Sequence, residues 1–272
     1  MTATGSLKVG VNWTKAAHAP LMSELMRSGR ADYCEILIDN FLHTPPHELA
    51  EVLGGAPVAF HIMHSRFLER SEEQLVQIAR RIREMARVLR PLYISDHLLR
   101  FTLGGRELVV LPELDYERVY EHVRERVTWW QNALDTQVCF ENYPSILDSG
   151  LKQPAFFEAL LADTKAGLLF DLSNSICAKR NCGVDPSAWD GLLRNATHFH
   201  TAGYELSANP PHIAVDTHGQ PLAEDTLALI RRVTGELPQP MTICVERDEK
   251  VELELWSQDL LAVREMRREP HA

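Results

Sequence analysis

Histidine, aspartate and glutamate side chains recur at the ends of short apolar runs along this 272-residue sequence. One run ends in FHIMH with His61, another in SDH with His97, and a third in FENY with Glu141. Similar segments carry the remaining candidates, which are Asp171 and Asn174 in FDLSN, His198 and His200 in HFH, Asp216 and His218 in DTH, and Glu246 and Asp248 in VERD. Imidazole and carboxylate groups are the side chains that divalent transition metals bind most readily in proteins.

The apolar runs before these residues recur with the period of a strand and helix unit. There are eight runs, and 272 residues divided among eight units give 34 residues per unit, the size of a βα pair. The sequence therefore predicts an α/β protein: a single (β/α)8 TIM-type barrel, one catalytic domain over residues 1–272. The predicted strands are Lys8–Trp13, Tyr33–Ile38, Pro57–His64, Leu92–Leu98, Gln137–Tyr143, Gly167–Asn174, Thr197–Gly203 and Thr242–Asp248.

Helical periodicity separates these strands. It is clearest over Ser71–Leu89, where apolar residues recur every three or four positions and acidic residues occupy the first turn. The other predicted helices are Tyr116–Leu134, Pro154–Leu161, Pro186–Leu193, Ala223–Val233 and Glu252–Met266. Two longer segments after strands, Leu99–Glu113 and Tyr204–Gln220, are expected to form active-site loops. An open doubly wound sheet is the alternative, but no GxGxxG segment follows the first strand and no Walker sequence occurs.

In a parallel barrel the C-terminal ends of all strands meet at one mouth, so the candidate side chains are expected to gather there. A single strand histidine is more often a hydrogen-bonded core residue, and a polar core is the alternative to a metal site. Several carboxylates at one mouth would repel each other strongly unless cations lie between them. We therefore predict a multinuclear metal site. The mixture of imidazole and carboxylate suits zinc, manganese or iron, and the residues alone do not separate these three.

The charge balance limits the partners. The formal net charge is −10 and the basic residues are scattered, so a protein that binds nucleic acid over a broad surface is not expected. The longest apolar runs, such as Pro57–Met63 and Ala166–Phe170, are far below the roughly 18 residues that span a bilayer, so no membrane association is expected. Met1–Val11 lacks the pattern of a signal peptide, which favours a cytoplasmic location.

The five cysteines agree with a reducing compartment. An odd number without a CxxC pair indicates neither a disulfide framework nor a thiolate zinc site. Cys139 and Cys244 lie two residues before Glu141 and Glu246, on the same strand faces. They are expected to pack inside the barrel.

Nearly the whole chain resembles one family. The segments that carry the resemblance are GVNW, EILIDNF, VAFHIM, YISDHLL, FENYPSI, LLFDLSNSICA, HFHTAGY, DTH and ERD. They are similar to segments of the multinuclear non-heme iron-dependent oxidases, and most similar to the members that act in methanobactin biosynthesis. The segments FENYPSI, LSNSICA and EILIDNF are long and specific, whereas the last dozen residues and the loop near Ala178–Pro186 contribute less.

The resemblance implies a xylose-isomerase-like barrel that holds two or three iron ions in mixed valence and uses O2 as co-substrate. It also implies a reaction in which a cysteine of a ribosomal precursor peptide is oxidised to an oxazolone ring beside a thioamide. These groups later bind copper in methanobactin. A partner protein similar to MbnC is expected to form a heterodimer with the chain and to help hold the precursor peptide.

Metal layouts in related barrels imply how the ligands are shared. One ion would take His61, His97 and Glu141; a second would take Glu141, Asp171, His200 and Glu246; and a third would take Asn174, Asp216 and His218. Glu141 would thus bridge two ions. Related phosphodiester-cleaving barrels carry a histidine in place of Asn174, so the third site is expected to be weaker. His198 has no place in this layout and is expected to support a ligand or to pack in the core.

Asp248 is the candidate catalytic residue. Closing a ring on a backbone amide oxygen requires protons to leave carbon and nitrogen, and a carboxylate beside the metals is suited to accept one. If the last strand continues through Asp248, its side chain faces the mouth, about 6.6 Å along the strand from Glu246. The structural alternatives are a salt bridge to Arg247 and an N-cap for the helix that begins at Glu252.

Two other functions would use similar ligands, namely a phosphodiesterase-like hydrolase and a sugar isomerase on the same barrel. A phosphodiesterase is expected to present basic residues to phosphate, whereas this chain is acidic overall. An isomerase usually keeps a lysine near the metals, whereas Lys165 and Lys179 do not lie at predicted strand ends. A non-catalytic scaffold for a peptide partner would not require such a metal-binding mouth.

Overall fold

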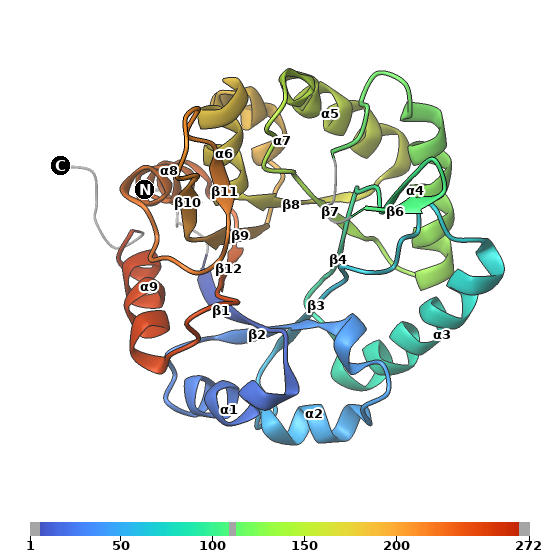
Figure 1. Ribbon diagram of the computed structural model, residues 1–272. Coiled ribbons are helices and arrows are strands. Elements are labelled where there is room, and N and C mark those ends of the chain that lie inside the picture. The colour runs from blue at the N-terminus through green and yellow to red at the C-terminus, as the bar shows by residue number, and fades with distance from the viewer. Residues whose placement is uncertain (1–5, 109–112, 267–272) are drawn as a thin grey trace.

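The computed structural model describes residues 6–108 and 113–266. Within them eight parallel strands close into a barrel in the order β1-β12-β9-β8-β7-β4-β3-β2, and helices surround it (Figure 1). The predicted (β/α)8 barrel is confirmed. Parallel neighbours require a crossover between them, and the helices outside the barrel provide these crossovers.

The barrel strands match the eight apolar runs predicted as strands, although most are shorter than predicted. They are β1 (Leu7–Trp13), β2 (Tyr33–Leu37), β3 (Val58–His61), β4 (Ile94–His97), β7 (Cys139–Glu141), β8 (Gly167–Asp171), β9 (His198–Ala202) and β12 (Met241–Glu246). Both strand faces are buried, one in the barrel and one under the helices, so most strand residues are apolar. The polar exceptions concentrate toward the C-terminal ends.

The helices of the described chain cover the outside of the barrel. They are α1 (Ala19–Arg27), α2 (Pro46–Val52), α3 (Glu72–Leu89), α4 (Tyr120–Leu134), α5 (Gln153–Thr164), α6 (Leu172–Cys182), α7 (Asp190–Leu193), α8 (Glu224–Glu236) and α9 (Leu253–Glu265), with short 3-10 turns at Ala16–His18, Ile38–Phe41, Asp148–Lys152 and Pro186–Trp189. The predicted helices are present with shifted ends, and Pro186–Leu193 divides into a 3-10 turn and α7.

Helix α3 shows how the sequence sets these elements. Ser71 caps its first turn, and the Ser71 backbone N–H donates to Gln74 Oε1 at 3.2 Å. Its buried face carries Leu75, Ile82 and Met85, which pack toward the barrel. The apolar positions that predicted the helix are therefore the positions that hold it in place.

The structure corrects the predicted end of β8. The prediction extended this strand to Asn174, but the strand ends at Asp171 and α6 begins at Leu172. The physical reason is a helix cap, because the Asp171 carboxylate accepts a hydrogen bond from the Asn174 backbone N–H at 2.7 Å. Asn174 therefore reaches the mouth from the first turn of a helix and not from a strand.

The predicted continuation of β12 through Asp248 is also wrong, since the strand ends at Glu246. The backbone N–H of Arg247 donates to Asn12 Oδ1 at 2.9 Å instead of to a neighbouring strand. The Arg247 guanidinium is buried and pairs with Asp259 of α9. These contacts turn the chain away from the barrel ladder before Asp248.

Hydrophobic packing forms two layers. The large cluster lies between the strands and the helices and includes Trp130, Phe140 and Phe170. A smaller cluster comprises Tyr33, Ala59, Tyr93, Cys139, Leu169 and Cys244. The expected packing of Cys139 and Cys244 is confirmed, because both are free thiols and both are buried.

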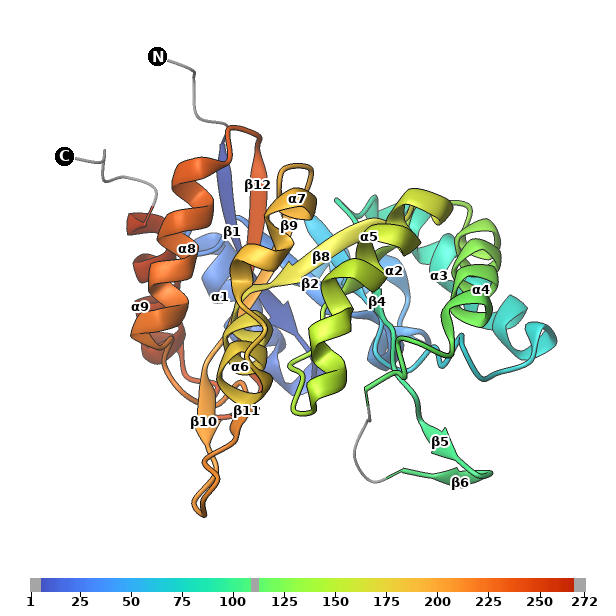
Figure 2. The same cartoon turned by 90° about the horizontal axis from the view of Figure 1, so that it is seen from above.

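Two small antiparallel hairpins extend from the end of the barrel where the strands finish (Figure 2). One pairs β5 (Thr102–Leu103) with β6 (Arg106–Glu107), and the other pairs β10 (Tyr204–Leu206) with β11 (Ala214–Asp216). They occupy the two segments predicted as active-site loops, of which residues 109–112 lie outside the described residues. Among the described residues, no helix has both the length and the apolar character needed to cross a membrane.

Candidate metal centre

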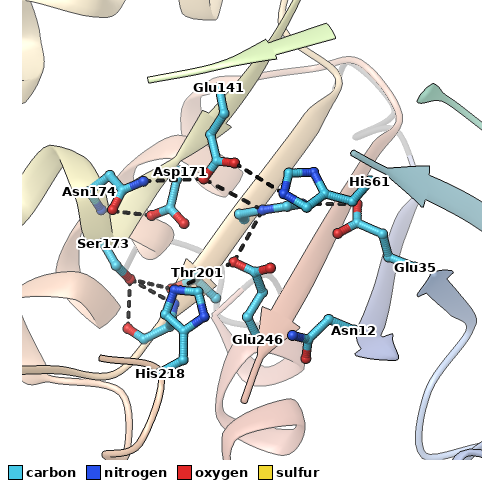
Figure 3. A network of polar contacts seen from close by, with 12 residues as sticks. Asn12, Glu35, His61, Glu141, Asp171, Ser173, Asn174, Thr201, His218 and Glu246 are labelled. Carbon is cyan, nitrogen blue, oxygen red and sulfur yellow. Dashed lines mark hydrogen bonds and ion pairs between the residues drawn. The ribbon is translucent and has the colours of Figure 1, made fainter. Parts of the chain in front are cut away.

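The C-terminal ends of the strands surround a cavity of about 390 Å³. All nine predicted ligands lie at its wall or directly beneath it, and Figure 3 shows several of them facing one another. Six come from barrel strands, namely His61, His97, Glu141, Asp171, His200 and Glu246. Asn174 comes from α6, and Asp216 and His218 come from the β11 strand and the loop after it.

Glu141 divides its two carboxylate oxygens between two groups of side chains. Its Oε2 lies 3.0 Å from Nε2 of His97 and 3.6 Å from Nε2 of His61. Its Oε1 lies 3.7 Å from Nδ1 of His200. Ligand atoms bound about 2.1 Å from one transition-metal ion lie about 3 to 3.5 Å apart. The carboxylate is therefore placed to contact an ion on each side.

The second group is fully buried and consists of Glu141, Asp171, His200 and Glu246. Each offers one ligand atom, and these atoms lie within 4.8 Å of one another. Nδ1 of His200 is 3.2 Å from Oε2 of Glu246. Strand register creates the group, because Asp171 lies opposite His200, and His200 lies opposite Cys244, two residues before Glu246.

A third set lies at the edge of the mouth. Nε2 of His218 is 2.7 Å from Asp216 Oδ2 and 3.9 Å from Glu246 Oε2. Asn174 joins this edge to the centre, since its Nδ2 donates to Glu141 Oε1 at 3.2 Å. The structure thus brings together the first two predicted sets and, of the third, Asp216 with His218, whereas Asn174 contacts Glu141 instead. Which of these side chains bind metal stays a prediction.

The loop that carries His218 needs a close backbone approach. A Cβ on Gly203 would lie 1.9 Å from the Gln220 carbonyl oxygen, so only glycine fits there. His218 itself has a φ of 53°, in the left-handed region that few residues other than glycine adopt. Its N–H donates to the Gly203 carbonyl and its carbonyl accepts from the Asp248 N–H, at 3.0 and 3.1 Å. These two backbone hydrogen bonds hold the His218 imidazole beside Asp216.

Outer contacts fix the orientation of the imidazoles. Nδ1 of His61 lies 2.8 Å from Ser95 Oγ, whose hydroxyl also donates to a backbone carbonyl, and Nδ1 of His97 lies 3.1 Å from the Ile62 carbonyl oxygen. In both rings Nε2 is then left to face Glu141. The Glu35 carboxylate orients the imidazole of His200 in the same manner, and the Asp248 carboxylate orients that of His218. Such contacts set the tautomer and the direction of a metal-binding histidine.

Glu35 is the supporting carboxylate that sequence reasoning missed. It is buried on β2, and its Oε2 lies 2.9 Å from Nε2 of His200, so Nδ1 of His200 faces Glu141 and Glu246. Tyr93 also donates to Glu35. Glu35, His61 and His200 themselves form a further group able to hold an ion. The signal in the sequence was an acid within the strand YCEIL, where an apolar residue is expected.

Asp248 lies in the turn after β12 and lines the cavity. Its Oδ2 is 2.8 Å from Nδ1 of His218, and its Oδ1 accepts from Asn12 Nδ2 at 3.0 Å. Burial alone would raise the pKa of Asp248, but the hydrogen bond and charge of His218 and the hydrogen bond from Asn12 bring it below its ordinary value. The side chain is 40% exposed, which leaves it accessible from the cavity.

The two structural alternatives for Asp248 are not realised. The guanidinium of Arg247 pairs with Asp259, and α9 begins at Leu253 with Glu252 as its N-cap residue. Asn12, which binds Asp248, was not singled out from the segment GVNW. Its partners lie more than 230 positions away, so no local spacing marked it.

Electrostatics show that the cluster requires positive charge. Burial together with the charges of Asp216, Glu141 and Glu246 raises the pKa of Asp171 well above its ordinary value. Burial alone would lower the pKa of His200, but the surrounding carboxylates raise it well above its usual range. Protons are thus drawn to the His200 imidazole and to the Asp171 carboxyl unless metal cations supply the charge.

The ligand set fits metal ions on a second observation. Several buried atoms of the predicted ligands have no hydrogen-bond partner among the described residues, namely Asp171 Oδ2, Asn174 Oδ1, His200 Nδ1 and Asp216 Oδ1. Buried polar atoms without partners are rare and costly in proteins. All four belong to side chains of the mouth, and the donor chemistry is mixed nitrogen and oxygen. A cluster of transition-metal ions would satisfy them.

His198 lies away from this cluster, at the start of β9. Its Nδ1 is 2.9 Å from Thr242 Oγ1, and its ring packs against Tyr93 with centroids 4.2 Å apart. Its exclusion from the ligand layout therefore agrees with its position. His198 and Tyr93 line a different cavity.

Comparison with known proteins identifies relatives along most of the chain. A family model described as RiPP precursor modification enzyme MbnB/TglH/ChrH matches residues 8–267. A UPF0276 protein of Acaryochloris marina is 27% identical over 230 residues, which is 82% of this chain and 80% of that protein. A UPF0276 protein of Paraburkholderia phytofirmans is 25% identical over 258 residues, which is 88% of this chain and 83% of that protein.

Solved structures share the fold. A xylose isomerase-like TIM barrel protein from Mycobacterium smegmatis, in complex with magnesium, matches with a TM-score of 0.60 at 15% identity, over 98% of this chain and 97% of that one. An L-ribulose 3-epimerase matches with a TM-score of 0.62 at 12% identity, over 96% of each chain. At such identities the likeness extends to the barrel architecture alone.

Proposed function

Because this chain belongs to the MbnB/TglH/ChrH family of RiPP precursor modification enzymes, we propose that it is an iron- and O2-dependent oxidase of a peptide cysteine. The proposed reaction converts a cysteine of a ribosomal precursor peptide to an oxazolone with an adjacent thioamide. This is the reaction expected for the methanobactin branch of the family, to which MbnB belongs. The proposed cofactor is two or three iron ions in mixed valence.

The single observation that carries the proposal is the position of Glu141. One of its oxygens faces His61 and His97, and the other faces His200. This arrangement supports a site for more than one ion, since a bridging carboxylate is how proteins hold two metals close together. The mixed imidazole and carboxylate ligands suit iron.

Bound iron would supply redox chemistry with O2, and the chain would supply the surroundings. We assign proton acceptance to the Asp248 carboxylate, because it lines the cavity and is not needed as a ligand. Asn12 and His218 hold its two oxygens in place. A base positioned in this way can remove a proton from a substrate carbon or nitrogen without moving.

The walls of the cavity suit a peptide. The lining combines apolar residues, which include Leu98, Leu99, Pro144, Ile146 and Val215, with the carboxylates and imidazoles of the metal centre. Apolar walls exclude water and favour an uncharged peptide segment over a phosphodiester, which needs cationic contacts. We propose that the precursor cysteine enters between these walls.

An apolar rim around the mouth supports a protein partner. Its exposed side chains are Leu103, Ile146, Leu147, Leu151, Leu206 and Val215. Leu103 and Leu206 lie on the two hairpins, which project from this end of the barrel (Figure 2). Exposed apolar groups gathered in one region indicate an interaction surface. We propose that an MbnC-like protein binds over this rim as a heterodimer and helps to hold the precursor.

The proposal is tested with the full chain purified without oxygen, reconstituted with Fe(II), and mixed with the precursor peptide and partner protein encoded beside it. Iron content, O2 consumption and the mass of the peptide are measured together. We expect at least two irons per chain, O2 uptake that depends on the peptide, and a mass change confined to the cysteine and the residue joined to it. Replacing that cysteine by serine in the peptide provides the matched control.

The runner-up function is a metal-dependent hydrolase or sugar isomerase on the same barrel. It predicts turnover without O2 and activity with zinc or magnesium in place of iron. Full iron content with no O2 uptake in the presence of precursor and partner would contradict the oxidase and favour this alternative.

A further inference from the structure

A second cavity lies at the opposite end of the barrel from the metal centre. Its volume is about 430 Å³, within the range of small-molecule sites. Its walls come from the end of α3, the start of β4, the end of α4 and the segment that leads into β7. This basal pocket is lined by, among others, Arg83, Arg87, Arg90, Leu92, Tyr93 and His198.

The rim of the basal pocket is cationic. Arg83, Arg87 and Arg90 follow one another at intervals of four and three residues, so they lie along one face of α3 and its C-cap. Among the described residues, none of the three has a carboxylate within 4.0 Å, whereas Arg80 and Arg81 of the same helix both contact Glu84. The rim therefore holds arginines that lack an acidic partner.

Helix geometry alone does not explain why these three arginines lie along one face. Cations near a helix C-terminus are favourable, but this effect falls off beyond the last turn, which leaves Arg83 outside it. Like charges four residues apart destabilise a helix, and Arg83 and Arg87 are such a pair. Nε of Arg83 is also buried without a hydrogen-bond partner among the described residues. Asp135 is the one acidic residue on the described wall, against three guanidinium groups.

The floor of the basal pocket is aromatic and apolar. The rings of Tyr93 and His198 lie 4.2 Å apart at an angle of 30°, and Leu92 is 39% exposed beside them. Tyr93 separates the two ends of the barrel, because its hydroxyl donates to Glu35 of the metal centre while its ring faces the basal pocket.

We infer that the basal pocket binds a small organic anion with a flat apolar body and one or more phosphate or carboxylate groups. Guanidinium groups bind both kinds of anion through paired, charge-assisted hydrogen bonds. The flat body would rest on Tyr93 and Leu92. An anion is directed to this place although the chain carries a net charge of −10, because the local charge of the rim is positive.

The test titrates the iron-loaded full chain with phenyl phosphate and, separately, with phthalate, using isothermal titration calorimetry. Inorganic phosphate, which lacks the apolar body, serves as a third probe. We expect one of the two aromatic anions to bind, and inorganic phosphate to bind more weakly than phenyl phosphate. The stronger aromatic probe identifies the ligand as a phosphate ester or a carboxylate.

The decisive variant is Arg83→Gln/Arg87→Gln/Arg90→Gln. It should weaken binding by at least about 10-fold, because it removes the charge-assisted contacts. The matched control Arg27→Gln/Arg118→Gln/Arg124→Gln removes the same charge from exposed arginines that contact acids in their own helices or turns, and should bind as the parent does. The single variant Arg87→Glu, at an exposed position, repeats the test if the triple variant is unstable.

Binding that survives in the triple variant would place the anion elsewhere, at the iron for example, and overturn the inference. Equal weakening in the control variant would show a response to net charge alone and would also overturn it. So would the absence of binding by both aromatic probes at concentrations up to about 10 mM, which corresponds to a negligible affinity.

Discussion

The centre and the edge of the candidate metal site are built differently. At the centre, Glu141, Asp171 and His200 are buried and stand on barrel strands, whose register fixes their spacing. At the edge, His218 and Asp248 are partly exposed and stand on loops held by a few side-chain and backbone hydrogen bonds. The same types of side chain therefore occur in a rigid environment and in an adjustable one.

The difference in burial suggests that the centre binds the metal ions and that the edge exchanges protons. Carboxylates that are buried together need cations to balance them, so the centre should determine how many metal ions are held. The edge can exchange protons with a substrate, because it is reached from the cavity. Variants that change one region at a time distinguish these two roles, and a response of the other region would contradict the division.

The largest effect is expected from Glu141→Gln. This change keeps the size of the side chain but removes the charge that two ions share, so the protein should lose at least one iron and its turnover should fall to background. Iron analysis and O2 consumption measure the two effects. Glu107→Gln, on the exposed β6 hairpin, is the control for the lost charge. Full iron content with normal activity in Glu141→Gln would show that the centre does not depend on this carboxylate.

Asp248→Asn should act on turnover alone. The variant is expected to keep its iron and to bind the precursor, while product formation falls by roughly 10²-fold, the usual scale for the loss of a general base. Iron per chain, peptide affinity and peptide mass are measured on the same preparation. Loss of iron would instead make Asp248 a ligand or a support for His218. Near-normal turnover with intact iron would remove it from the mechanism.

Glu35→Gln tests whether Glu35 supports the His200 ligand at the centre. Loss of the charge behind His200 should weaken iron binding by about 10 to 100-fold, the range found for partners of metal-binding histidines. Competition with a chelator gives the affinity without relying on activity. Tyr93→Phe is the matched control, because it removes the other hydrogen bond to Glu35 but leaves the contact with His200. If both variants bind iron as the parent does, Glu35 has no part in the centre.

Removal of the metal ions from the centre should lower the free energy of unfolding. A ligand that binds only the native state, at 100 times its dissociation constant, adds about 2.7 kcal/mol to the free energy of unfolding. Chelation should therefore lower the melting temperature of the parent protein clearly, and that of Glu141→Gln much less. An equal shift in both would mean that the metals which stabilise the fold do not depend on Glu141.

The smallest effect is expected at the apolar rim around the mouth of the barrel. Leu147→Asp places a charge at an exposed apolar position near the mouth and should weaken partner binding by about 10-fold, within the range of interface hot spots. Leu261→Asp, similarly exposed but on α9, is the control. Both variants should unfold within about 0.5 kcal/mol of the parent, as surface substitutions usually do. Equal partner affinity in the two variants would remove the rim from the interface.

The barrel could be predicted because each of its strands leaves a local trace. An apolar run buried on both faces and followed by an amphipathic helix is visible within about 30 residues, and eight such units suffice to predict closure. The ends of elements were less predictable. β8 and β12 stop where Asp171 caps a helix and where Arg247 pairs with Asp259, and these contacts depend on partners that periodicity does not show.

The candidate ligands were also recognisable, since a carboxylate or imidazole at a strand end interrupts an apolar run. Glu35 was not, because it lies inside its run and its partner His200 is 165 positions away. Asn12 was missed for the same reason. Residues that orient other side chains are defined by three-dimensional contacts, so their types alone do not distinguish them from ordinary polar residues.

The proposed function requires that Glu141 joins two iron ions in one cluster. Mössbauer and electron paramagnetic resonance spectra of the anaerobically iron-loaded chain test it most directly, because ions bridged by a carboxylate lie about 3.5 to 4 Å apart and couple magnetically. We expect at least two irons per chain with coupled spins, and the loss of that coupling in Glu141→Gln. A single iron per chain, or several irons with no coupling, would contradict it.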